Sequence, residues 1–145
     1  MKDIEYDSGI YLLEIYLENK SEISVGKMGK YIFPTGYYYY IGSAQLRLHS
    51  RLKRHIRKDK KLRWHIDFLI DKARLVDFFT WNAGRDKECM LSSFLEEYLQ
   101  GDIIVPGFGS SDCSCISHLY YFSSPLDKAL LPEKIESRSD LNVDK

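Results

Sequence analysis

The densest group of chemically active side chains is a basic run between Arg47 and Arg63. The segment RLHSRLKRHIRKDKKLR holds nine Lys or Arg residues and one Asp, whereas the rest of the chain has twelve basic and twenty acidic residues. Positive charge concentrated on an otherwise acidic chain is typical of proteins that bind phosphate-rich partners, because neutralised phosphates release counterions. A solvated helix face is the alternative interpretation. The residues expected to steer a nucleic-acid backbone are Lys53, Arg54, Arg57, Lys58, Lys60, Lys61 and Arg63.

Arg51 and Glu88 have side chains suited to a phosphodiester. A guanidinium donates two N–H groups to one phosphate, a geometry that lysine lacks. Glu88 begins a helical stripe that continues with Leu91, Leu95 and Leu99, which is an unusual position for a carboxylate. Carboxylates are the ligands of hard cations. The sequence therefore predicts one divalent cation, Mg²⁺ or Mn²⁺, at Glu88.

Three cysteines and a histidine form a second group of potential ligands. An odd number of cysteines does not predict a disulfide framework. Cys113, Cys115 and His118, together with Cys89, could hold zinc, although one residue between two thiolates is tighter than the usual zinc spacing. The alternatives are buried cysteine packing, or a loop whose backbone amides line a substrate groove.

The hydrophobic pattern predicts one α/β domain over residues 1–132, with a small, mainly antiparallel sheet flanked by helices. Within the first strand, Leu13 and Ile15 should face the core, and Glu14 the opposite side. The segment 133–145 is polar and is expected to be a disordered tail. The predicted strands are 9–17, a hairpin within 23–33, 36–44, 74–82 and one that ends near 122; the predicted helices are 45–58, 62–73 and 87–99.

Two tripeptides, GIY at 9–11 on the first strand and YIG at 40–42 before the basic helix, resemble the signature motifs of the GIY-YIG endonuclease superfamily. The resemblance continues through Arg51 and His55, four residues apart, then His65 and Glu88, and covers most of the chain. The 29-residue separation of Tyr11 and Tyr40 implies an extra hairpin between the signature strands. This hairpin and the segment GFGSSDCSCISHL both resemble features of a small, largely prokaryotic branch of the superfamily. Domains of that branch are sometimes attached to endonuclease III-like DNA glycosylases.

This resemblance implies a metal-dependent endonuclease that hydrolyses DNA phosphodiester bonds, in repair or branched-DNA processing. It implies that Tyr11 accepts a proton, that Arg51 binds the scissile phosphate and that Glu88 binds the metal. His55 and His65 are further candidate bases or phosphate donors. The hydroxyl of Tyr40 would position water or phosphate, whereas the tyrosines at 37–39 are expected to pack the sheet.

Two other functions remain open at this point. One is a nucleic-acid-binding module with the same fold and no catalysis, and the other is a zinc-stabilised structural domain. Tyr11 and Glu88 favour the enzyme, because phosphate binding alone needs neither a phenol nor a carboxylate. No apolar run reaches the roughly 18 residues of a membrane span, and the N-terminus is polar, so we expect a cytoplasmic protein without a membrane partner.

Overall fold

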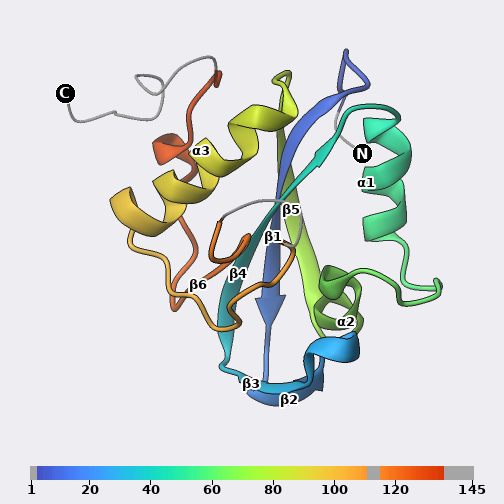
Figure 1. Ribbon diagram of the computed structural model, residues 1–145, viewed down its shortest axis with the longest axis vertical. Coiled ribbons are helices and arrows are strands. Elements are labelled where there is room, and N and C mark those ends of the chain that lie inside the picture. The colour runs from blue at the N-terminus through green and yellow to red at the C-terminus, as the bar shows by residue number, and fades with distance from the viewer. Residues whose placement is uncertain (1–2, 111–114, 136–145) are drawn as a thin grey trace.

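The central element is a four-stranded antiparallel sheet with the order β5-β1-β4-β6 (Figure 1). The computed structural model describes residues 3–110 and 115–135. The strands are β1 (Gly9–Leu17), β4 (Gly36–Ala44), β5 (Arg74–Trp81) and β6 (Leu119–Phe122). The long inner strands β1 and β4 pair over their whole length, and Tyr11 lies opposite Gly42. The two signature tripeptides are therefore neighbours at one end of the sheet.

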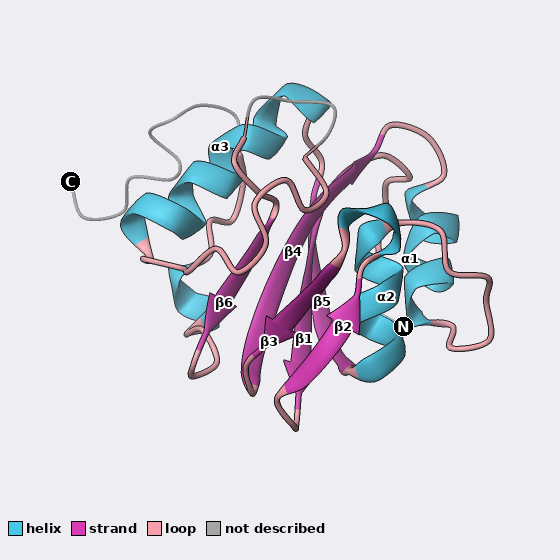
Figure 2. Cartoon of the chain, turned by 60° about the horizontal axis from the view of Figure 1, so that its bottom comes forward, coloured by secondary structure: helices cyan, strands magenta, loops and turns pink. Residues whose placement is uncertain are grey.

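The extra hairpin predicted between the signature strands is present. β2 (Ser21–Ser24) and β3 (Lys30–Phe33) pair antiparallel and form a separate two-stranded sheet. It follows the end of β1 and precedes the start of β4, so it lies at the opposite end of these strands from Tyr11 (Figure 2). The insertion thus extends the fold without covering the end that carries the motifs.

Helices cover both faces of the central sheet, which confirms the predicted α/β class. α1 (Leu48–Ile56) and α2 (His65–Lys72) pack on one face, and α3 (Glu88–Ser93), which continues as a π-helical segment (Phe94–Tyr98), packs on the other (Figures 1 and 2). On β1, Leu13 and Ile15 face α1 and α2, whereas Ile10 and Leu12 face α3. Each face of the sheet therefore belongs to a separate hydrophobic cluster.

Glu14 lies on the opposite side of β1 from Leu13 and Ile15, as predicted, but this side is covered as well, by the cluster that packs against α3. Glu14 is 2% exposed, and its Oε2 accepts hydrogen bonds from Tyr39 Oη at 2.5 Å and from Lys128 Nζ at 2.7 Å. A buried carboxylate needs such partners, since an unpaired charge in the core is costly. The alternation of β1 did not reveal this burial, because Lys128 lies 114 residues away in the sequence.

The basic run does not form one continuous helix. The predicted helix extended to Lys58, but α1 ends at Ile56 and Arg57 is already extended, with φ −71° and ψ 128°. Residues 57–64 then connect α1 to α2. Lys60 Nζ turns back and donates to the carbonyl oxygens of Arg54 and His55 at 3.0 and 2.9 Å. This contact satisfies carbonyl groups that a helix C-terminus leaves without intrahelical partners.

The packed chain continues past the predicted domain boundary at residue 132. Ile135 is 3% exposed and belongs to the cluster between α3 and the sheet. Trp81 Nε1 donates to the carbonyl oxygen of Pro132 at 2.8 Å, which fixes this segment beside β5. Residues 136–145 of the predicted tail lie outside the described residues. Among the helices that the structure describes, none is long and apolar enough to cross a membrane.

Candidate active site

A cleft of about 420 Å³ lies at the end of the sheet that carries both signature tripeptides. It receives residues from β1, β4, α1, α2, α3 and four connections, because the antiparallel register brings the start of β1 to the end of β4. Five of the six predicted catalytic residues line it. The lining residues are Tyr11, Tyr40, Gly42, Ser43, Gln45, Arg51, Arg63, Trp64, His65, Arg85, Glu88, Gly109 and His118.

Gly9 and Gly42, the glycines of the two tripeptides, are required because neighbouring atoms lie too close for a side chain, rather than because the chain must be flexible there. A Cβ at Gly42 would lie 2.4 Å from both Cζ and Oη of Tyr11, so any larger residue would displace that hydroxyl. A Cβ at Gly9 would lie 2.1 Å from the carbonyl oxygen of Trp81 on β5. Gly42 therefore provides the space for the Tyr11 ring, and Gly9 lets β1 approach β5.

Tyr11 is held from behind by His55. Tyr11 Oη and His55 Nε2 are 2.9 Å apart, and the ring centroids are separated by 5.3 Å. His55 has no exposed surface, and its Nδ1 has no hydrogen-bond partner among the described residues. Burial, assisted by the charge of Lys60, lowers the pKa of His55 to about 3, so the ring is neutral near pH 7. His55 does not line the cleft; it orients Tyr11.

Both signature tyrosines are neutral phenols in this site. Burial raises the pKa of Tyr11 well above its usual value, and the opposing effect of Arg51 is smaller. Burial likewise raises the pKa of Tyr40, with a further contribution from Tyr11. The two ring centroids lie 6.5 Å apart. Neither hydroxyl is ionised near pH 7, so both can donate as well as accept hydrogen bonds.

The other tyrosines of β4 have the packing role predicted for them. Tyr38 and Tyr39 have no exposed surface. The Tyr38 hydroxyl donates to the carbonyl oxygen of Pro34 at 2.5 Å. Tyr37 packs its ring against Tyr16 with centroids 4.9 Å apart. The hydroxyls of Tyr38 and Tyr39 form hydrogen bonds within the fold, and none of these three tyrosines lines the cleft.

Arg51 is positioned by backbone and aromatic contacts. Its Nη1 donates to the carbonyl oxygen of Ser43 at 2.9 Å, which ties α1 to the end of β4. Its guanidinium carbon lies 5.0 Å from the ring centroid of Trp64. These contacts restrict the side chain before any ligand binds, which reduces the entropy cost when the guanidinium binds a phosphate.

His65 reaches the cleft from the first residue of α2. The backbone N–H of Gly109 donates to His65 Nδ1 at 2.9 Å. Because a backbone amide can only donate, Nδ1 carries no proton, and the ring proton of the neutral imidazole is on Nε2. Burial also lowers the pKa of His65. His65 is thus a neutral hydrogen-bond donor rather than a cation.

Glu88 is the first residue of α3, and its carboxylate borders the cleft with 13% of the side chain exposed. Its Oε1 lies 3.8 Å from His118 Nδ1. The negative charge of Glu88 contributes to the raised pKa values of both Tyr11 and Tyr40. The carboxylate is therefore close enough to both hydroxyls to interact with them electrostatically. One carboxylate in a polar cleft suits Mg²⁺ or Mn²⁺, since Mg²⁺ retains several waters.

The basic run divides into structural and exposed cations. Arg54 Nη1 and Nη2 each donate to the Asp67 carboxylate at 2.9 Å, and Lys58 Nζ donates to the carbonyl oxygens of Ile70 and Ala73 at 2.5 and 2.7 Å. The charged groups of these residues and of Lys60 bind partners within the chain, although Lys58 is itself exposed. The side chains of Lys53, Arg57 and Lys61 are exposed, and Arg63 lines the cleft.

Sequence reasoning missed several cleft residues. Arg85 is a second exposed cation of the cleft, but it lies outside the basic run, so charge clustering did not reveal it. The ring centroid of Trp64 lies 4.1 Å from the guanidinium carbon of Arg54, and Trp64 also borders the cleft. His118 was considered only as a zinc ligand. The backbone bond from Ile41 N to His118 O at 2.9 Å brings it to the end of β4, and only the strand pairing reveals this.

The predicted zinc ligands are only partly described. Cys113 lies outside the described residues. Cys89, Cys115 and His118 lie close together on the α3 side of the sheet.

Comparison with known proteins identifies a family without an assigned activity. No curated protein and no solved structure matches the chain. A family model described as "Domain of unknown function DUF123" matches residues 10–139, which include both signature tripeptides apart from Gly9 and every residue that lines the cleft. The chain therefore belongs to the DUF123 family.

Proposed function

We propose that the protein is a metal-dependent endonuclease of the GIY-YIG superfamily that hydrolyses phosphodiester bonds in DNA. One observation supports this above all: a single cleft collects Tyr11, Tyr40, Arg51, His65 and Glu88 from five different elements. A site of two phenols, a guanidinium, a neutral imidazole and a carboxylate contains the groups that phosphodiester hydrolysis requires.

Each residue has a role that follows from its contacts. Arg51, preoriented by Ser43 and Trp64, binds the non-bridging oxygens of the scissile phosphate. Tyr11, oriented by His55, hydrogen-bonds the attacking water and accepts its proton once the phenol itself has ionised. The burial-raised pKa of Tyr11 means that this ionisation requires more positive charge in the cleft than Arg51 supplies alone.

Tyr40 and His65 provide further neutral donors in the cleft. The Nε2 proton of His65, fixed by the Gly109 contact, can donate to a phosphate or leaving oxygen. The Tyr40 hydroxyl positions water or phosphate. Glu88 would hold Mg²⁺ or Mn²⁺. Such a cation, when bound, stabilises charge on phosphoryl oxygens and lowers the pKa of bound water.

The second candidate function is a DNA-binding module without catalysis. The exposed cations Lys53, Arg57 and Lys61 and the cleft residues Arg63 and Arg85 would serve either function. The buried pair of Tyr11 and His55 favours the nuclease, because phosphate binding does not require a buried histidine behind a cleft phenol.

The direct test is a cleavage panel of linear, flapped and four-way DNA with Mg²⁺, with Mn²⁺ and with EDTA. We expect metal-dependent cleavage of at least one substrate by the wild type. Tyr11→Phe keeps the ring and should reduce the rate by about 10²-fold or more. Tyr38→Phe is the matched control, because it removes the hydroxyl of a buried tyrosine on β4, away from the cleft, and should cleave like the wild type. DNA binding without cleavage under every condition would establish the binding module instead.

A further inference from the structure

We propose that Cys89, Cys115 and His118 form a structural Zn²⁺ site that ties the segment before β6 to α3. The site lies beside the Mg²⁺ or Mn²⁺ position at Glu88, uses different ligands and does not depend on nuclease activity. It would hold the segment that contains His118 against the helix that carries Glu88.

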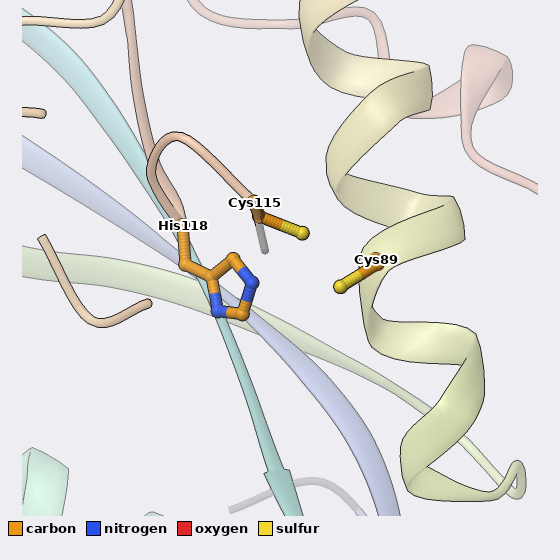
Figure 3. Close-up of side chains that lie close together, drawn as sticks. All are labelled: Cys89, Cys115 and His118. Carbon is orange, nitrogen blue, oxygen red and sulfur yellow. The ribbon is translucent and has the colours of Figure 1, made fainter. Parts of the chain in front are cut away.

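The geometry brings three metal-binding atoms together from two distant segments. Cys89 is on the first turn of α3, and Cys115 and His118 lie on the connection that leads into β6. One ligand atom from each residue lies within 4.8 Å of the other two. Figure 3 shows both sulfur atoms and a ring nitrogen of His118 directed at the same space. His118 is 2% exposed and both cysteines are half-buried, so the protein partly encloses this arrangement.

The donor set selects zinc over the hard cations. Two thiolates and an imidazole are soft or borderline ligands, which suit Zn²⁺, whereas Mg²⁺ and Ca²⁺ require oxygen donors. Tetrahedral bonds of about 2.3 Å to sulfur and 2.0 Å to nitrogen place ligand atoms roughly 3.5–3.8 Å apart. Binding therefore needs a contraction of about 1 Å from the described positions, which side-chain rotation can supply. Three protein ligands leave one coordination position for another donor.

Glu88 is placed to orient the histidine ligand. Because Glu88 Oε1 lies 3.8 Å from His118 Nδ1, Nε2 is the nitrogen left to bind the metal. A carboxylate beside the other ring nitrogen is the usual outer partner of a zinc-bound histidine, since it fixes the tautomer and ring orientation. The zinc site and the cleft thus share the pair formed by Glu88 and His118.

Metal analysis of the full chain, purified without chelator, tests this proposal. We expect about one Zn²⁺ per chain in the wild type and less than a fifth of that in Cys89→Ser and in His118→Asn. His49→Asn changes a histidine on α1, outside this cluster, and should keep the full zinc content. Replacement of zinc by Co²⁺ should give thiolate charge-transfer absorption and tetrahedral d–d bands, both absent in Cys89→Ser. Neither readout depends on DNA cleavage.

A second measurement separates loss of metal from loss of folding. Removal of zinc from the wild type should lower its thermal midpoint, and added Zn²⁺ should restore it. Cys89→Ser replaces one sulfur with oxygen and should keep the far-ultraviolet circular dichroism of the wild type, but its midpoint should not respond to zinc. The proposal is overturned by a folded wild type that neither contains nor takes up zinc, or by a purified chain whose mass and thiol count show Cys89 and Cys115 joined in a disulfide.

Discussion

His55 is a neutral histidine buried behind the hydroxyl of Tyr11, and this position makes the stability of the protein depend on acidity. Its pKa falls from the usual 6.5 to about 3 in the folded chain, chiefly because burial disfavours the cation. The unfolded chain therefore binds a proton as the pH drops below about 6.5, while the folded chain does not. The stabilising contribution is complete above that pH and declines progressively toward about 3.

We predict that His55→Gln flattens this dependence. Between about pH 6.5 and 5, where few carboxylates titrate, His55 should cost the wild type up to about 1.4 kcal/mol of unfolding free energy per pH unit, and the variant should lack this slope. His65 and His118 also have lowered pKa values but remain in both proteins. Urea unfolding at several pH values measures the difference. Equal slopes in the two proteins would mean that His55 is protonated in the folded state or is not buried.

At the scale of elements, Asp67 joins α1 to α2. It is fully buried, accepts two hydrogen bonds from Arg54, and accepts the backbone N–H groups of Arg63 and Trp64 at 2.8 Å each. Burial opposes ionisation, but these hydrogen bonds outweigh it and lower the pKa of Asp67. The carboxylate also caps the start of α2, because Asp67 lies three residues after the N-cap residue Trp64.

We predict that Asp67→Asn lowers the free energy of unfolding by about 3–5 kcal/mol, because it leaves the Arg54 guanidinium partly buried without a counter-charge. Asp59→Asn is the matched control, since Asp59 is exposed in the connection between the same helices and should change stability by less than about 0.5 kcal/mol. Denaturant unfolding measures both. A small change in Asp67→Asn would show that the pair with Arg54 is not needed to hold α1 and α2 together.

The basic run also shows how far sequence reasoning extends at this scale. The positions of strands and helices followed from the spacing of hydrophobic residues. The sequence also singled out the motif residues Tyr11, Tyr40, Arg51 and Glu88 as a group, and the fold gathers them in one cleft. Charge clustering could not separate Arg54, Lys58 and Lys60, whose charged groups bind Asp67 or backbone carbonyls, from the other cations of the run. Those partners become adjacent only when α1 and α2 pack.

The same limit explains what sequence reasoning missed about β1 and the cleft. Alternation along β1 placed Glu14 opposite Leu13 and Ile15, but it did not reveal that α3 covers this face too or that Lys128 neutralises Glu14. Arg85 and Trp64 reach the cleft through tertiary packing and have no motif of their own. Local pattern identifies which residues can do chemistry; the pairing of distant segments decides which of them share a site.

At the scale of the whole molecule, the cleft concentrates positive charge on a chain with a formal net charge of zero. Arg51, Arg63 and Arg85 all line it. We predict that Arg63→Gln combined with Arg85→Gln weakens binding to duplex DNA at every sequence and reduces the slope of log affinity against log salt by about 0.9 for each phosphate that is no longer neutralised. Fluorescence anisotropy at several salt concentrations measures this slope.

The matched control is Lys27→Gln combined with Lys30→Gln, which removes two exposed cations of the β2–β3 hairpin, outside the cleft. It should leave the salt slope unchanged. If the slope falls as much in the hairpin variant as in the cleft variant, DNA binds by general attraction to the surface and the cleft is not the binding site.

Glu88→Gln tests the central claim, that the cleft cuts DNA with the help of a divalent cation. Glutamine has the same shape and removes only the charge, so the variant should keep the thermal midpoint of the wild type within a few degrees. It should bind DNA at least as tightly in the absence of metal, because a negative charge beside the phosphates is gone. The deciding measurement is the Mg²⁺-dependent cleavage rate of a bound substrate: our account predicts a decrease of about 10²-fold or more in a folded, DNA-bound variant. Cleavage at the wild-type rate by Glu88→Gln would contradict it.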